Sequence, residues 1–398
     1  MHLRARLSGI GVAALAAIPL AVLGPAGASH AAVSPAQKTT HSCATSKAGF
    51  ASCKAILRTD VVEPQAVSPN ATPSGFGPSS LQSAYALPSS TAGAGRTVAI
   101  VDAYDDPTAE ADLGVYRAQF GLPACTTANG CFKKVSQTGG TSYPKKDGGW
   151  AQEISLDLDM VSAICPNCHI LLVEAKTSSF ANLGAAVNQA AKTAGVVAIS
   201  NSYGGSDASD ATYGSYYNHP GIAVTASSGD AGYGASYPAS SHYVTAVGGT
   251  SLSTASNTRG WSETAWSGAG SGCSAYNTAL SGAASFGTGC ANRAEADVSA
   301  VANPSTGVAV YDSTAYQGYV GWMVFGGTSV SSPIIASVYG LAGNTASIDN
   351  NYPYTHSSSL NDVTSGSNGS CPTTQWCNAR AGWDGPTGLG TPNGIGAF

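Results

Sequence analysis

Short apolar runs alternate with segments of helical length along most of the chain. The segments 151–164 and 181–193 have the length and apolar content of helices that pack on a sheet. Five runs are short and almost free of polar residues, as expected for strands buried on both faces: 98–101, 169–173, 196–200, 222–226 and 244–247. The alternation predicts an α/β fold with a mainly parallel central sheet flanked by helices, followed by an irregular Gly- and Ser-rich stretch.

The N-terminus predicts export. Residues 1–32 combine Arg4 and Arg6 with an apolar run and a zone of small residues, which is the pattern of a secretory signal peptide. No later segment has the ~18 uninterrupted apolar residues that a membrane span needs. We therefore expect a secreted, extracellular protein that has no membrane association in its mature form.

The rest of the chain divides by composition. Residues 33–75 are rich in Pro, Ser and Ala and are too few to bury a core of their own, so they are interpreted as a short pro-segment or N-terminal arm. Residues 76–398 are long enough for one large domain. Only 10% of residues are charged and the net charge is −5, which argues against nucleic-acid binding and favours tolerance of acid. A monomer is expected.

Ten cysteines in an exported chain are most simply disulfides. Their spacing suggests five local pairs: Cys43–Cys53, Cys125–Cys131, Cys165–Cys168, Cys273–Cys290 and Cys371–Cys377. The third pair is followed directly by His169, which leaves zinc or redox chemistry as an alternative there. A second pair of ligands is not evident, so the disulfide is the favoured interpretation.

A candidate nucleophile stands at 326–333, where Gly-Gly-Thr-Ser-Val-Ser-Ser-Pro runs directly into an apolar helical segment. Glycines before Ser329 allow close approach of a substrate, and the free amides at a helix start can stabilise an oxyanion. The structural alternative is a Ser-rich turn that caps a buried helix.

A serine nucleophile needs a base, and the sequence favours a carboxylate over a histidine. His169, His219, His242 and His356 all lack the small residues of a helix start that would present an imidazole to a cleft. Glu153 and Asp157 instead lie four residues apart on one face of an apolar helix, where like charges are unfavourable unless they share a proton. The alternative is that acids near a helix start favour its dipole, which suits Asp159 better.

Polar residues also collect where the predicted strands end. Asp102, 201–204 and 227–230 each follow an apolar run. Because ligand crevices in α/β sheets lie at the carboxyl ends of strands, these residues are expected to lie near one another.

These motifs together resemble the sedolisin family, the serine-carboxyl peptidases with a subtilisin-like three-layer fold. Glu153-xxx-Asp157 is similar to the family's acid pair, Ser329 in Gly-Thr-Ser to its nucleophile, and Asp230 in Ser-Ser-Gly-Asp to its oxyanion aspartate. The stretches 237–250 and 297–300 also resemble family segments, so the likeness covers about 76–398. The family usually has a large folded pro-domain, whereas only some forty residues follow the signal here.

The resemblance implies a secreted, acid-active endopeptidase that acts on proteins or peptides. It implies that Glu153 and Asp157 supply acid-base catalysis to Ser329, and that a protonated Asp230 stabilises the oxyanion. It also implies that Ser202, Tyr203 and Gly204 pair with the substrate backbone as an added strand. Side-chain specificity, and endo- against tripeptidyl-peptidase activity, are left open.

The resemblance also implies one structural calcium ion. The corresponding ligands are the side chains of Asp362 and Asp384 and the carbonyls of Val363, Arg380 and Gly382. Two carboxylates with carbonyls suit a hard cation, and a carbonyl ligand does not depend on Arg380 standing where the family commonly has Gly. The alternative is two ordinary loop aspartates.

Two further hypotheses concern function. The order Asp102, His169, Ser329 would fit a subtilisin-like triad, although His169 lacks the expected His-Gly-Thr context. A catalytically inactive secreted binding protein on the same fold is the other alternative, which the joint presence of Ser329, the acid pair and Asp230 disfavours.

Overall fold

The computed structural model describes residues 38–61 and 73–398. The predicted signal peptide lies outside the described residues, as does part of the predicted pro-segment. No helix in the described ranges is both long and apolar enough to span a membrane.

The central sheet has eight strands and is mainly parallel. Seven follow the order β12-β11-β9-β7-β4-β6-β5, with β15 pairing in parallel with β11 and only β12 antiparallel. Their bounds are β4 (Thr97–Ala103), β5 (Phe132–Ser136), β6 (His169–Ala175), β7 (Val196–Asn201), β9 (Ala223–Ser227), β11 (Thr245–Thr254), β12 (Trp261–Ala265) and β15 (Val298–Val301). The inner strands β4 and β6 are apolar over their middle residues because helices cover both faces.

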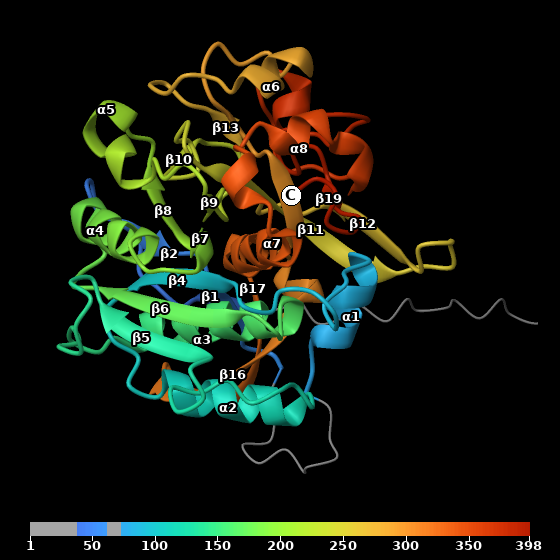
Figure 1. Ribbon diagram of the computed structural model, residues 1–398. Helices are drawn as coiled ribbons and strands as arrows, with labels where there is room; N and C mark the ends of the chain where they lie inside the picture. The colour runs from blue at the N-terminus through green and yellow to red at the C-terminus, as the bar shows by residue number, and fades with distance from the viewer. Residues whose placement is uncertain (1–37, 62–72) are drawn as a thin grey trace, which may run out of the picture. The chain divides into compact units, whose positions relative to one another are not determined.

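Alternate side chains of β4 enter two different cores. Val98 and Ile100 pack in the larger core with helices α3 (Gly148–Ile164) and α7 (Thr328–Ala342). Val101 points to the other face, where helix α4 (Phe180–Ala191) contributes Leu183. In Figure 1, α4 lies on one side of β4 and β6, and α3 lies on the other. This confirms the predicted three-layer α/β architecture.

Two small sheets frame the carboxyl edge of the central sheet. One has the order β1-β3-β17-β16 and the other β10-β8-β2. The strands outside the central sheet are β1 (Thr39–His41), β2 (Ser52–Cys53), β3 (Ile56–Arg58), β8 (Tyr203–Ser206), β10 (Ser236–Tyr237), β13 (Gly272–Cys273), β14 (Ala294–Glu295), β16 (Val308–Tyr316), β17 (Tyr319–Gly326), β18 (Leu360–Asn361) and β19 (Thr391–Pro392). The remaining helices are α1 (Pro78–Ala84), α2 (Ala109–Gln119), α5 (Asp210–Tyr213), α6 (Ser281–Ser285) and α8 (Tyr352–Thr355).

The element boundaries correct the sequence-based prediction at two places. α3 begins at Gly148, three residues earlier than expected, because the Asp147 side chain caps it by accepting from the amides of Gly149 and Trp150. β11 continues to Thr254 where an irregular stretch was expected, since β12 pairs with its second half. The β16–β17 hairpin was not predicted.

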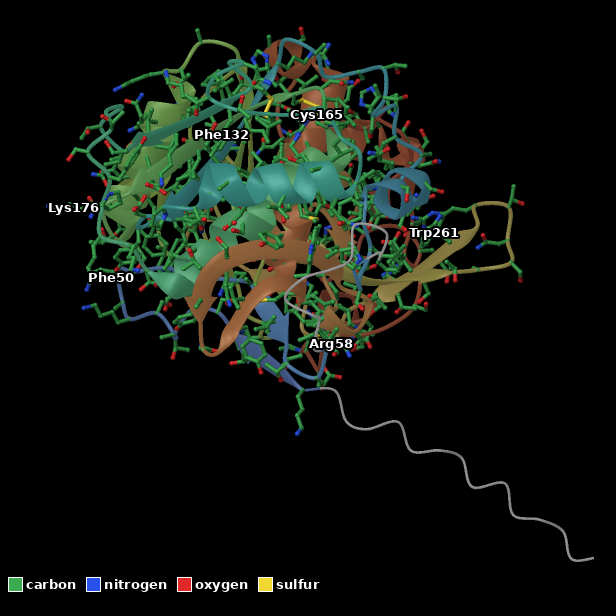
Figure 2. The ribbon with its side chains drawn as sticks, turned by 90° about the horizontal axis from the view of Figure 1, so that it is seen from below. Phe50, Arg58, Phe132, Cys165, Lys176 and Trp261 are labelled. Atoms are coloured by element: carbon green, nitrogen blue, oxygen red, sulfur yellow. A yellow bond between two sulfur atoms is a disulfide. The ribbon has the colours of Figure 1, made fainter. Side chains whose placement is uncertain are left out.

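All five predicted disulfides are present. The bond between Cys165 and Cys168 follows α3 and is marked at Cys165 in Figure 2. His169 is exposed beside it, and no group of three or more His, Cys, Asp or Glu side chains in the described part of the chain could hold a metal. The two sulfur atoms of this pair are bonded to each other, so neither is a thiolate that could bind zinc, and the disulfide interpretation is confirmed.

Candidate active site

Ser329 is the second residue of α7, and a glycine shapes the approach to it. Gly327, the N-cap residue, has a φ of 96°, which favours glycine. A Cβ atom at Gly327 would lie 1.8 Å from the Lys54 carbonyl oxygen, so no larger residue fits. The Ser329 hydroxyl is buried and donates to the Ser202 carbonyl oxygen at 3.2 Å. The Gly-Thr-Ser sequence therefore brings a serine to a helix start in close contact with another backbone segment.

The carboxyl groups of Glu153 and Asp157 both lie on the inner side of α3 and are fully buried. Asp157 Oδ1 accepts from the Ser202 hydroxyl at 2.7 Å, and Glu153 Oε2 accepts from the Ala55 amide at 2.8 Å. The second oxygen of each carboxyl group is buried and has no hydrogen-bond partner among the described residues. Two unsatisfied buried carboxyl oxygens are costly unless a proton or a substrate group occupies them.

A third carboxyl group, Asp102 near the end of β4, lies close enough to act on this pair. Burial raises the pKa of Asp102 to about 8. Burial also raises the pKa of Glu153 well above its usual range; the Asp102 charge adds to this, whereas the Ser329 hydroxyl and Ala55 amide oppose it. The pKa of Asp157 is raised for the same first two reasons. The sequence analysis placed Asp102 at a strand end near the expected crevice, but it linked Asp102 to catalysis only through a His-based triad.

Asp230 approaches α7 from the loop after β9. Its Oδ1 accepts from both the amide and the hydroxyl of Thr328 at 2.8 Å. Its Oδ2 is buried and has no hydrogen-bond partner among the described residues. Both this oxygen and the Lys54 carbonyl oxygen lie close to the place where a side chain on Gly327 would stand. Burial raises the pKa of Asp230, while the Lys54 charge lowers it. A protonated Asp230 would carry its hydrogen-bond donor beside the start of the nucleophile helix.

The predicted substrate-binding residues Ser202, Tyr203 and Gly204 lie beside the carboxyl pair of α3. Ser202 bonds to Asp157 through its hydroxyl, and Tyr203 and Gly204 open β8. In this structure β8 pairs antiparallel with the chain's own β2, in the register Ser52↔Gly204 and Cys53↔Tyr203. The backbone edge that was expected to hold a substrate thus holds a segment of the N-terminal arm.

The subtilisin-like triad is not assembled. His169 pairs with Thr97 at the amino end of β4, whereas Asp102 pairs with Glu174. Five residues of strand therefore separate His169 from Asp102, or about 16 Å. His169 is also exposed, whereas Asp102 is fully buried. This register contradicts the alternative with His169 as the base.

The residues predicted to bind calcium are brought together around one loop. The Gly382 amide donates to Asp362 Oδ2 at 2.9 Å, and the Arg380 amide donates to Asp384 Oδ2 at 3.2 Å. Both carboxylates therefore face the loop whose Arg380 and Gly382 carbonyls complete the predicted set with that of Val363. An all-oxygen set with two carboxylates has the composition that calcium prefers. The residues fit the ion, although the predicted set contains only two acidic side chains.

Comparison with known proteins finds relatives in both sequence and structure. Kumamolisin from Bacillus sp. (strain MN-32) is 29% identical over 378 residues, which covers 83% of this chain and 64% of Kumamolisin. The solved structure of Pseudomonas sedolisin, a serine-carboxyl proteinase complexed with two molecules of pseudo-iodotyrostatin, matches with a TM-score of 0.66 and 26% identity over 81% of this chain and 96% of that one. Both comparisons support the sedolisin family.

Other comparisons add little beyond this assignment. Tripeptidyl-peptidase sed1 from Aspergillus fumigatus is 37% identical over 78 residues, 18% of this chain and 12% of that protein. No family model matches the chain. The chain spans less than two thirds of the length of Kumamolisin. The relatives named here are peptidases, and that chemistry is considered for this chain below.

Proposed function

We propose that this chain is a secreted, acid-active serine-carboxyl endopeptidase that hydrolyses peptide bonds through an acyl-enzyme on Ser329. The observation that carries the proposal is the meeting of three groups from distant parts of the sequence. Ser329 at the start of α7 and the Glu153–Asp157 pair on α3 converge on Ser202 and on each other, while Asp230 holds the residue before the serine.

Glu153 acts as the general base. When the Ser329 hydroxyl attacks a peptide carbonyl, Glu153 takes its proton, and it later gives that proton to the leaving amine. Asp157 orients the pair and shares the proton, since two buried carboxyl groups this close do not both ionise readily. Carboxylate bases of this kind favour activity in acid.

Asp230 stabilises the oxyanion together with the backbone amide of Ser329. Two hydrogen bonds from Thr328 fix one oxygen of Asp230, which leaves Oδ2 free to carry a proton and donate it to the developing charge. A neutral aspartic acid in this role resembles a known solution to the same problem in another enzyme. The β8 edge formed by Ser202, Tyr203 and Gly204 then aligns the substrate backbone as an added strand.

We further propose that the mature protein is an extracellular monomer with one structural calcium ion. Asp362 and Asp384 with the carbonyls of Val363, Arg380 and Gly382 would hold the ion, which would supply stability and no part of the chemistry. Two hydrogen bonds from Thr387 to Asp384 Oδ1 fix the orientation of this carboxylate in its loop.

The deciding experiment is hydrolysis of denatured protein at acid pH by the wild type, Ser329→Ala and Ser331→Ala. Ser331 is the matched control because it lies on the same helix but donates to the Ala300 and Val301 carbonyls. Hydrolysis by the wild type and Ser331→Ala, with none by Ser329→Ala, supports the proposal. A wild type without hydrolytic activity would instead favour a binding protein on this fold.

A further inference from the structure

The β16–β17 hairpin touches both helices that carry the proposed catalytic groups. β17 leads through a single glycine into α7, whose second residue is Ser329. At the other end of the hairpin the Tyr316 ring packs on the backbone at the start of α3, where a Cβ atom at Gly148 would lie 2.6 Å from the ring. Tyr316 and Trp150 line the same cavity, and Trp150 stands three residues before Glu153. The position of the hairpin therefore bears directly on α3.

Four buried carboxyl groups, here called the hairpin cluster, lie where the hairpin meets α2 and α3: Asp106, Asp112, Asp159 and Asp312. The Tyr311 amide of the hairpin donates to Asp159 of α3 at 3.0 Å. The amide and the hydroxyl of Ser313 donate to Asp112 of α2, at 2.9 and 3.1 Å. Figure 2 shows the hairpin, in orange, beside α2, in teal. Carboxyl groups therefore make the polar contacts that hold the hairpin on both helices.

The hairpin cluster has no counter-charge of its own, because no ion pair among the described residues includes any of its four members. Two cations face it, but both are bound elsewhere. Lys134 pairs with Asp105 and Glu174, and the Arg117 guanidinium donates to two carbonyl oxygens and to the Ser162 hydroxyl. The titratable and charged groups that face the cluster are Asp105, Tyr116, Arg117, Lys134, Glu174 and Tyr311.

Two members of the cluster each have a buried oxygen without a hydrogen-bond partner in the described chain, Asp106 Oδ2 and Asp312 Oδ2. Their other oxygens are close to one residue of the hairpin: Asp312 Oδ1 accepts from the Thr314 amide at 2.7 Å, and Asp106 Oδ1 accepts from the Thr314 hydroxyl at 3.3 Å. Two buried carboxylates this close repel each other and lose hydration. The docked hairpin is therefore favoured when they are protonated.

We propose that the hairpin is a pH-sensitive latch, which is docked on α2 and α3 in acid and undocks from them near neutral pH while the central sheet stays folded. Burial raises the pKa of Asp106 to about 6 and that of Asp312 to about 8, so undocking releases protons. The preference for the docked state is complete below about pH 4 and is lost as the pH rises through these two values. Undocking takes Tyr316 off α3, so the helix that carries Glu153 is held firmly only in acid.

Hydrogen–deuterium exchange of the full chain tests the latch, in Ser329→Ala so that self-digestion is prevented. Between pH 5 and pH 8 the protection factors of amides 308–322, corrected for the intrinsic effect of pH on exchange, should fall by about tenfold or more. The start of α3, residues 148–152, should lose protection with the hairpin. The amides of β7, in the middle of the sheet, should keep theirs. Unchanged hairpin protection overturns the inference, and an equal loss in the hairpin and β7, which means global unfolding, also overturns it.

Asp312→Asn in the same background tests the cause. The variant keeps an oxygen for the Thr314 amide but cannot ionise, so its hairpin protection at pH 8 should exceed that of the parent by about tenfold or more. Asp106→Asn removes the facing charge and should act in the same direction, which provides a second variant if Asp312→Asn does not fold. Asp349→Asn, at an exposed carboxyl group, is the control and should behave as the parent. Asn variants of the cluster that lose hairpin protection as the parent does overturn the inference.

Discussion

Two groups of buried carboxyl side chains lie in this protein, and burial raises pKa values in both. The catalytic cluster consists of Asp102, Glu153 and Asp157. The hairpin cluster lies where the β16–β17 hairpin meets α2 and α3, and consists of Asp106, Asp112, Asp159 and Asp312. Burial raises the pKa of Asp106 to about 6 and that of Asp312 to about 8. A raised carboxyl pKa by itself therefore does not mark the active site.

The two clusters differ in what their oxygens contact. In the hairpin cluster each carboxyl group accepts from a backbone amide; the donors to Asp106, Asp112, Asp159 and Asp312 are Thr108, Ser313, Tyr311 and Thr314 respectively. In the catalytic cluster the partners are a serine hydroxyl and the Ala55 amide of the N-terminal arm, and both Asp102 oxygens are without a partner in the described chain. Carboxyl groups held by backbone amides of the hairpin stabilise the fold, whereas a carboxyl group beside the Ser329 hydroxyl is placed for proton transfer.

The largest expected effect is on kcat, and it should distinguish Glu153 from Asp159, two buried carboxyl groups of helix α3. Glu153→Gln should lower kcat by about 10²–10⁴-fold, because the amide cannot accept the Ser329 proton. Asp159→Asn, the matched control from the hairpin cluster, keeps an oxygen for the Tyr311 amide and should leave kcat within about threefold of wild type. Steady-state hydrolysis of a peptide at acid pH measures both. Equal losses in the two variants would mean that the comparison between the clusters is wrong.

The next effect concerns Asp230, whose titration we place on the high-pH limb of the rate profile. Asp230→Ala should lower kcat by about 10²–10³-fold at every pH, since an oxyanion donor is lost. Asp230→Asn keeps a donor that does not titrate, so it should retain part of the activity and lose it at a higher pH than wild type. The shift will be partial because the Glu153–Asp157 pair still titrates. An unmoved limb in the Asn variant would assign Asp230 a structural role.

The layers of the fold and the acid pair on α3 could be predicted from the sequence, whereas the segments that pack around the site could not. The apolar runs of β4, β6 and β7 and the spacing of Glu153 and Asp157 on α3 are local patterns, and the structure has these elements where the patterns place them. The pairing of β2 and β3 with β8 and β17 could not be predicted, because it joins residues more than a hundred positions apart.

A similar limit applied to Asp159. Sequence reasoning assigned it to the favourable dipole of a helix start, but α3 begins at Gly148, so Asp159 lies in the middle of the helix. Its actual partner is the Tyr311 amide in β16, a strand that the sequence analysis did not predict. A buried acid can be recognised as unusual from sequence, but its partner is set by tertiary packing.

The hairpin cluster should make the protein less stable as the pH rises. Folding raises the pKa of Asp106 and Asp312 above the unfolded value of about 3.9, so the folded state binds their protons more tightly. This contribution is complete below about pH 4 and is lost as the pH rises through about 6 and about 8. At about 1.4 kcal/mol per pKa unit, reduced by relaxation around the charge, the loss should be on the order of 1–3 kcal/mol.

Denaturant unfolding from pH 4 to 8, in a Ser329→Ala background that prevents self-digestion, measures this slope. Asp312→Asn should flatten it, because the amide does not titrate. Asp349→Asn, at an exposed carboxyl group, is the control and should keep the slope of the parent. A slope that is the same in both variants would remove the hairpin cluster as the source of acid stability.

The smallest expected effect concerns Asp362 and Asp384, a third acidic pair that resembles neither cluster. These carboxylates accept from amides of one loop, as in the hairpin cluster, yet the carbonyls of that loop complete an oxygen set suited to calcium. If the ion binds only the folded state, chelation at neutral pH should lower the Tm by several degrees, and added calcium but not magnesium should restore it. Asp362→Asn should show a lower Tm and no response to chelator, whereas Asp349→Asn should respond as wild type does. A Tm that neither falls with chelator nor rises with added calcium would place this pair with the hairpin cluster, as carboxyl groups that hold backbone and nothing else.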